Sequence, residues 1–304
     1  METLTIPQKL KALVDGVIHN PIVQREIKQT FRKSKIFWIF GVYLFLLAGA
    51  AFYIFGVTMT LSGVTSGFEP QSSSVMYLVI LGIQMLVMTL VAPVSTSTAI
   101  SGEKERQTFD LLIITKTSMY DIILGKLLSS LMIVGIMLIL SMPVYAVVFY
   151  YGGVTIGKFI MNMLYLVSYV AMVGSLGIAF STVMKKSAAA SIATVLLIFA
   201  MTIGIWIALG MVMAFIASAS MLMDDFEPWR IIGQLFMFNP IVSFISIVDS
   251  HMGTDVSWEL LDEIGFSFEN KYIYCWHINM VLHIIVAHLL IKFSAKRIAP
   301  IRKK

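Results

Sequence analysis

Six stretches without a single Asp, Glu, Lys or Arg, each long enough to cross a lipid bilayer, constrain the fold of this chain more than any other feature. The hydrocarbon core of a membrane is about 30 Å thick and needs roughly 20 helical residues at about 1.5 Å each. Lipid cannot hydrogen-bond an open backbone, and the alternating pattern of barrel strands is absent, so each stretch is expected to be an α-helix. The predicted spans lie near Ile36–Thr58, Val75–Thr98, Leu127–Tyr151, Phe159–Met184, Ser187–Ile216 and Tyr272–Ile291.

The composition excludes a soluble domain. Hydrophobic residues make up 58% of the chain and charged residues only 13%, whereas soluble domains have about 25% charged residues. The mean hydropathy is +0.88. The first apolar stretch begins only at Ile36, too far from the N-terminus for a secretory signal peptide, so it is expected to remain in the mature protein. We therefore predict an all-α integral membrane protein with a six-span domain over residues 36–293.

Lys and Arg are concentrated at the two ends of the chain and in alternate connectors. Short loops rich in these residues stay cytoplasmic, so segment 1–35 and the basic tail 294–304 are both expected on the cytoplasmic side of the cell (cytoplasmic or inner) membrane. The connectors after the second and fourth spans should lie on the same side, since they hold Lys104, Arg106, Lys116, Lys126, Lys185 and Lys186. The formal net charge of +5 is thus assigned to the inner membrane surface, and nucleic acid is not an expected partner.

The connector between the fifth and sixth spans, residues 217–271, is rich in Asp and Glu and is expected outside. It contains the uncharged run Ile231–Val248, which Asn239-Pro240 interrupts. A seventh crossing here would place the basic tail outside. The run is therefore interpreted as a pair of outer re-entrant or interfacial helices.

Before the first span, Asn20-Pro21 is typical of a helix start, with Asn as the cap and Pro at the first helical position. Apolar residues then recur every four positions while basic residues occupy much of the remaining surface, which indicates an interfacial helix on the inner leaflet. The alternative is a basic flank that only sets the topology. The apolar positions are Val23, Ile27 and Phe31, and the basic ones are Arg25, Lys28, Arg32 and Lys35.

The connector between the second and third spans has an amphipathic pattern of its own. Glu103 and Glu105 stand near its expected helix start, where exposed amide groups favour negative charge. The spacing of the apolar residues that follow predicts a short helix over about 101–115 with one apolar face. That face consists of Phe109, Leu112 and Ile113.

A second helix should begin after this connector. Ser118 with Asp121 three positions later is typical of a capping box, so the helix of the third span is expected to start there after a break at Thr115–Thr117. The alternative for the whole connector is a solvated charged loop, to which a soluble partner would not dock.

These residues carry a resemblance to a known family. The run Ser101-Gly-Glu-Lys-Glu-Arg-Gln-Thr-Phe-Asp-Leu-Leu, followed by Thr115-Lys-Thr-Ser and Ile123-Leu-Gly-Lys126, resembles the pattern of permeases of ATP-binding-cassette (ABC) transporters of the type-2 exporter class. Asn20-Pro21-Ile22-Val23 with Arg25-Glu26 is similar to the N-terminal segment of such permeases, and Asn239-Pro240 to their outer-loop region.

The resemblance implies that this chain and a separate ATPase carry out different parts of transport. The segment matching 101–115 would be a coupling helix that sits in a cleft of a separate cytoplasmic P-loop ATPase, and the segment matching 20–35 a connecting helix along the membrane surface. Two permease subunits, identical or different, would assemble with two ATPases. ATP and Mg²⁺ would be bound by the ATPase, with no cofactor in this chain. The implied coupling-helix contacts are Glu103, Glu105, Arg106, Thr108, Phe109 and Leu112, and the connecting-helix residues are Arg25, Glu26 and Arg32.

One position departs from the family pattern, which usually has Gly where Gln107 stands. Gln is a better helix former than Gly by up to about 1 kcal/mol. The coupling helix is therefore expected to be more continuous in this chain.

A Walker-like string raises the question of whether this chain binds ATP itself. Gly152–Lys158 satisfies G-x-x-x-x-G-K, but Phe159 replaces the Ser or Thr that should hold magnesium. The string also lies in an outer turn between two spans, without a preceding strand. We interpret it as a chance match, so the chain is not expected to be an enzyme.

Three histidines, His277, His283 and His288, lie in the sixth span. The first and the last are separated by about 16 Å along a helix, so they cannot bind one metal, and no metal site is expected. Hydrogen bonding to neighbouring helices is one role open to them. Besides the exporter subunit that the resemblance implies, the runner-up interpretation of the chain is an ATPase-coupled subunit for signalling or mechanical work without a transported substrate. A polytopic membrane enzyme that uses these histidines comes after it.

Overall fold

The computed structural model describes residues 34–62, 70–109, 118–152, 154–208, 210–211, 215, 239–252 and 275–298. The predicted connecting helix with Arg25, Glu26 and Arg32, and the predicted contact Leu112, lie outside the described residues. The described part is helical and contains no strand. The all-α fold class is thereby confirmed.

Six helices in the described part are long and apolar enough to cross a membrane, which confirms the six predicted spans. The elements are α3 (Ser34–Ser62), α4 (Pro70–Glu105), α6 (Met119–Tyr150), α7 (Ile156–Val183), α8 (Ser187–Phe199) with the π-helical η1 (Ala200–Gly204), α11 (Pro240–Met252) and α13 (Cys275–Ile298).

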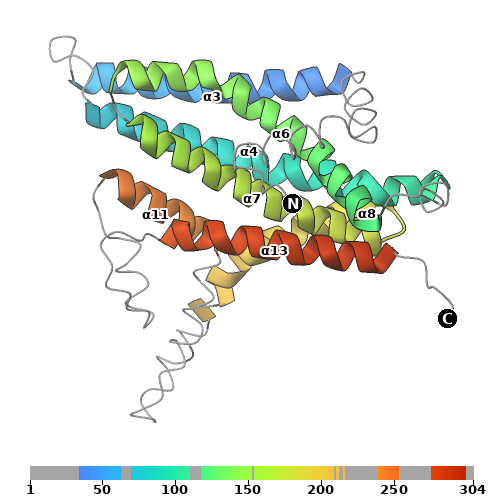
Figure 1. The fold of residues 1–304 in the computed structure, drawn as a ribbon. Helices are drawn as coiled ribbons and strands as arrows, with labels where there is room; N and C mark the ends of the chain where they lie inside the picture. Colours follow the sequence, from blue (N-terminus) through green and yellow to red (C-terminus); the bar gives the residue numbers. More distant parts are fainter. Residues whose placement is uncertain are drawn as a thin grey trace, which may run out of the picture.

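Helix α7 lies at the centre of the bundle, where it packs along α4 on one side and α13 on the other (Figure 1). In the most apolar 18-residue stretch of α7, 67% is buried inside the protein, compared with 22% for the corresponding stretch of α3 and 17% for that of α8. Small residues permit this close packing. A Cβ on Gly177 would overlap Oγ1 of Thr96 on α4, so only glycine allows the two helices to approach this far.

The apolar side chains form two buried groups. The larger fills the bundle between α3, α4, α6 and α7, and includes Tyr43, Tyr77 and Tyr145. The smaller lies where the ends of α4, α6, α7 and α13 meet, and Phe109 packs against it. We call this smaller group the second core. Its buried members are Ile100, Ile123, Leu127, Ile178, Ile291, Ala295 and Ile298.

One local sequence prediction is confirmed. The Oγ of Ser118 accepts a hydrogen bond from the backbone N–H of Asp121 at 3.1 Å, so the capping box does start α6. Helix α11 begins directly after Asn239, whose Oδ1 accepts from the N–H of Ile241 at 2.8 Å. With 13 residues α11 is too short to cross a bilayer. The first half of the proposed outer helical pair lies outside the described residues.

The helix expected to begin near Ser101 is not separate. Residues Ser101–Glu105 are the last turn of α4, which runs unbroken from Pro70. Glu103 and Glu105 therefore stand at the end of a helix instead of at its start. The sequence pattern was misleading because the charged run continues the periodicity of the apolar span without a residue that marks a stop.

Candidate functional site

The end of α4 is the most densely bonded polar region in the described part of the chain. Helix α4 has 36 residues, about 54 Å at 1.5 Å per residue, so it extends well beyond a hydrocarbon core of about 30 Å. Its last turn reaches the ends of α6, α7 and α8. We call Glu103, Lys104 and Glu105, with the groups that they bind, the α4 junction.

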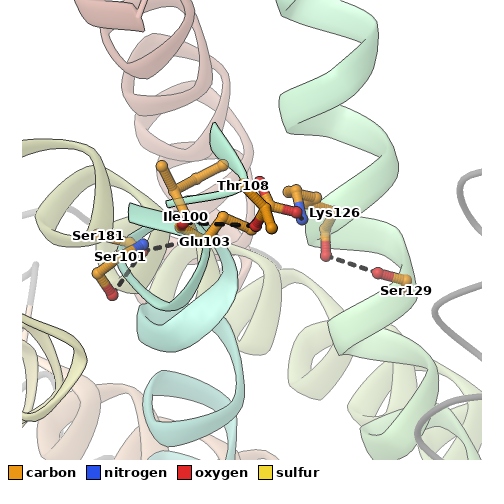
Figure 2. Close-up of polar contacts among 7 residues, drawn as sticks. All are labelled: Ile100, Ser101, Glu103, Thr108, Lys126, Ser129 and Ser181. Carbon is orange, nitrogen blue, oxygen red and sulfur yellow. Dashed lines mark hydrogen bonds and ion pairs between the residues drawn. The ribbon is translucent and has the colours of Figure 1, made fainter. Parts of the chain in front are cut away.

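The junction rests on a buried serine of α7. The backbone N–H groups of Ile100 and Ser101 both lie within hydrogen-bond distance of the Oγ of Ser181, at 2.9 and 2.7 Å (Figure 2). The Oγ of Ser181 in turn donates to the Oγ of Ser101 at 3.2 Å. Because both serines are fully buried, these bonds fix the position of α4 along α7.

Glu103 binds α6. Its Oε1 lies 2.7 Å from the Nζ of Lys126, which is only 2% exposed (Figure 2). A lysine so deeply buried is stable in its charged form only beside an anion, and removing one partner of such a pair strands the other. The other oxygen of Glu103, Oε2, is buried and has no hydrogen-bond partner among the described residues.

Lys104 binds the end of α7. Its Nζ donates to the carbonyl oxygens of Ser181, Thr182 and Met184 at 3.4, 2.5 and 3.4 Å. The last carbonyls of a helix have no partner within the helix and carry partial negative charge, so a cation is favoured there. Lys104 therefore caps α7 from a different helix.

Glu105 binds the start of α8. Its two carboxylate oxygens accept hydrogen bonds from the N–H and the Oγ of Ser187, at 2.9 and 2.6 Å. The N-cap residue of α8, Lys186, offers no side-chain cap of its own. Three consecutive charged residues of α4 thus bind three different helices: α6, α7 and α8.

Helix α4 ends in a tight turn with the bonding of a Schellman motif. The N–H of Thr108 donates to the carbonyl of Glu103 at 3.0 Å, and that of Gln107 to the carbonyl of Lys104 at 3.2 Å. Gln107 has φ = 57°, the left-handed conformation that favours glycine. The expectation that Gln107 makes the helix more continuous is therefore wrong: the turn imposes its conformation on the residue.

The predicted coupling-helix residues separate into two groups. Glu103 and Glu105 bind other helices of the same chain, and Phe109 is half-buried against the second core with the Nζ of Lys104 5.7 Å from its ring centroid. Arg106 and Thr108 are exposed at the turn. The sequence contained no pattern that identified Ser181 and Ser187 as partners. The charge of Lys126 at the start of an apolar helix, in contrast, was a signal that a carboxylate must lie nearby.

The Walker-like string begins a transmembrane helix. Lys158 lies in the first turn of α7 and its Nζ donates to the carbonyl of Ser250 on α11 at 2.7 Å. Phe159 is buried against the rings of Tyr145 and Phe149, with centroids 5.1 and 5.0 Å away. The string thus joins α7 to α11 and α6, and α7 follows another helix instead of a strand.

Polar side chains also line the interior between α4, α6, α7 and α11, toward the end of the bundle opposite the junction. The Nδ2 of Asn162 donates to the Oη of Tyr77 at 2.8 Å, and the ring of His251 stacks on that of Tyr77 with centroids 5.1 Å apart. Gln84 donates to the Oγ of Ser141 at 3.3 Å and accepts from Tyr145. This network adds polar contacts between α4, α6, α7 and α11 at the end away from the junction.

The three histidines of the last span have different surroundings. His283 is buried between the rings of Tyr165 and Tyr169. His277 stacks on Trp276 and is half-buried, whereas His288 is exposed beside Tyr120. Within the described ranges, no three side chains of His, Cys, Asp or Glu are grouped closely enough to hold a metal ion.

Comparison of the sequence with models of protein families gives a match. The family model described as ABC-2 family transporter protein matches residues 21–291, which is most of the chain. A comparison with curated proteins found no match.

Proposed function

The chain belongs to the ABC-2 transporter family as a multi-pass membrane permease subunit, and we propose that it forms the substrate path of an ATP-driven exporter. In this proposal a separate cytoplasmic P-loop ATPase docks at the connector that follows Glu105. ATP and Mg²⁺ are bound by that ATPase, and a second permease subunit completes the path.

The α4 junction is the observation that supports this proposal. A force applied to the connector would reach α6 through the Glu103–Lys126 pair, α7 through Lys104 and α8 through Glu105. Ion pairs and charge-assisted hydrogen bonds hold a more definite geometry than apolar contacts do. The junction is thus suited to convert one movement of a docked protein into a joint movement of several spans.

The exposed residues Arg106 and Thr108 are the proposed contacts to the ATPase. Glu103, Glu105 and Phe109 instead hold the connector on the bundle, so their effect on docking would be indirect. The resemblance implies ATPase contacts for all of these residues, and we propose that Arg106 and Thr108 make the direct ones.

Purification of the tagged chain from its native membranes tests the proposal. A P-loop ATPase should co-purify, and the complex should hydrolyse ATP. Arg106→Glu should lower the amount of co-purified ATPase by about tenfold, which corresponds to about 1.4 kcal/mol of binding free energy. Lys296→Glu, which makes the same charge change at an exposed residue of the same end of the bundle, should not. A chain that purifies without any ATPase and without ATP hydrolysis contradicts the proposal.

The proposed orientation has its own test. The chain contains a single cysteine, Cys275, which is buried, so a cysteine introduced at Lys303 can be labelled selectively. Both termini are proposed to lie in the cytoplasm, and an impermeant thiol reagent added to intact cells should not label Lys303→Cys until the membrane is opened. Labelling from outside would overturn the proposed orientation.

A further inference from the structure

Between α7, α11 and α13 lies a group of buried polar side chains that the α4 junction does not involve. We call Tyr165, Ser246, Trp276, Asn279 and His283 the His283 cluster. Each is at most 4% exposed. The polar atoms without a hydrogen-bond partner among the described residues are the Oη of Tyr165, the Oγ of Ser246, the Nε1 of Trp276, the Oδ1 of Asn279 and both ring nitrogens of His283.

These side chains converge from three helices. Trp276, Asn279 and His283 recur at three- and four-residue spacing on one face of α13. The ring of Tyr165 on α7 lies 5.6 Å from that of His283 and 6.3 Å from that of Trp276. From α11, Ser243 accepts a hydrogen bond from the Nδ2 of Asn279 at 2.6 Å, and Ser246 follows one turn later. Buried polar side chains from α7, α11 and α13 therefore face one another inside the bundle.

Their burial needs a compensating partner. A buried polar group without a hydrogen bond destabilises the fold, and a bilayer provides no bulk water to relieve that cost. Native proteins contain few such groups, and where several gather, an ordered small ligand is the usual explanation. The cluster therefore indicates a bound ligand.

The chemistry of the cluster defines that ligand. The Nε1 of Trp276 can only donate a hydrogen bond and the Oδ1 of Asn279 can only accept one, while the hydroxyls and the imidazole can do both. All five side chains are uncharged or can be so, which favours a neutral ligand that both donates and accepts. Water is the smallest ligand that can both donate and accept hydrogen bonds.

We propose that the His283 cluster is a buried water-binding site that joins the short helix α11 to α7 and α13 through water-mediated hydrogen bonds. Helix α11 cannot cross the bilayer, and its buried face includes Ser243, Ser246 and Asp249. Bound water would supply a hydrogen-bond partner for Ser246, whose Oγ has none among the described residues. The inference is independent of the ATPase partner.

X-ray hydroxyl-radical footprinting of the purified chain tests this, because radicals formed from bound water oxidise the side chains that touch it. Trp276, Tyr165 and His283 should be oxidised despite their burial, as the exposed Tyr150 is. The buried Met137, in the apolar core, should stay unmodified. Absence of oxidation at all three cluster residues, or oxidation of Met137 to the same extent, would overturn the proposal.

Matched serine variants locate the water. Ser246→Ala combined with Asn279→Leu should lower the oxidation of His283 several-fold, since two ligands of the water are lost. Ser294→Ala removes another buried and unpartnered hydroxyl of α13, at the opposite end of the helix, and should leave it unchanged. Equal oxidation of His283 in both variants would contradict a site built by this cluster, and the result for the unaltered chain stands even if the double variant fails to fold.

Discussion

The α4 junction and the His283 cluster are both polar regions buried in an apolar bundle, yet their bonding is opposite. In the junction Lys126, Lys104 and Glu105 each bind a group on another helix, and only Oε2 of Glu103 lacks a hydrogen bond among the described residues. In the cluster every member has a buried polar atom without a hydrogen-bond partner among the described residues. The junction thus has nearly all of its partners within one chain, whereas we propose that the cluster binds water.

This difference shows that buried polar groups can hold helices together in two ways. Charged groups with matched partners specify one relative position of helices, because any other position strands a charge. Neutral groups that bond through water tolerate small shifts, since water can reorient. We therefore expect the helix ends at the junction to move together and α11 to be held more loosely against α7 and α13.

The largest expected effect is the loss of the buried ion pair. Glu103→Gln leaves Lys126 charged and buried without its carboxylate, and should destabilise the fold by about 3–5 kcal/mol. At about 2–4 °C per kcal/mol, the midpoint of thermal unfolding in detergent should fall by roughly 10 °C. Adding Lys126→Met should restore most of the loss. A fall of less than about 2 °C in the single variant would mean that the pair does not hold α4 to α6.

A pair of serine variants compares the two regions directly. Ser181→Ala removes the two hydrogen bonds that its Oγ accepts from α4 at the junction, and at about 0.5–1.5 kcal/mol each this should cost about 1–3 kcal/mol. Ser246→Ala in the cluster removes a hydroxyl that has no partner among the described residues, and should cost less than about 1 kcal/mol. Thermal unfolding of both variants measures the difference, and a larger loss for Ser246→Ala would reverse the comparison.

A change at the end of α4 should stabilise the chain. Gln107 occupies a left-handed position that costs a residue with a side chain about 1–2 kcal/mol. Gly avoids this cost but has more freedom to lose on folding, so Gln107→Gly should stabilise by up to about 1 kcal/mol net. Gln107→Ala, which keeps a Cβ, is the matched control and should not stabilise. If both variants behave alike, the turn differs from the one described.

The smallest expected effect is a pH dependence at α11. Burial, and to a lesser degree the charge of Lys158, lower the pKa of His251, while a hydrogen bond to the carbonyl of Ile247 partly opposes them. The folded state therefore favours neutral His251. Stability should be unaffected well above the ordinary pKa of about 6.5 and should be lost as the pH falls below it, because the unfolded chain then binds the proton more tightly. Thermal unfolding at pH 5 and pH 8 should show a smaller acid loss in His251→Gln than in the parent chain.

Features set by local sequence could be predicted, and features set by contact between distant residues could not. The six spans follow from uncharged runs and the start of α6 from Ser118 and Asp121, whereas Asn239-Pro240 indicated an interruption and not the start of α11. The end of α4 was misplaced because a Gln instead of a Gly stands in its left-handed turn.

The junction was missed for a different reason. Its acceptors on α7 are backbone carbonyls and its partner on α8 is Ser187, and neither has a sequence signature. The cluster could be found only in part: the sequence drew attention to His283, but not to Tyr165 or Ser246, which reach it from other helices.

The central claim is that the α4 junction transmits movement of the connector to α7 and α8. Spin labels at Lys185, in the turn between α7 and α8, and at Tyr150, at the far end of α6, measure that movement by double electron–electron resonance in the complex with its co-purified ATPase. Trapping with ATP and vanadate should shift the distance in the parent chain. In a Lys104→Met, Glu105→Gln variant the shift should disappear while ATP hydrolysis persists, and an equal shift in both would contradict the account.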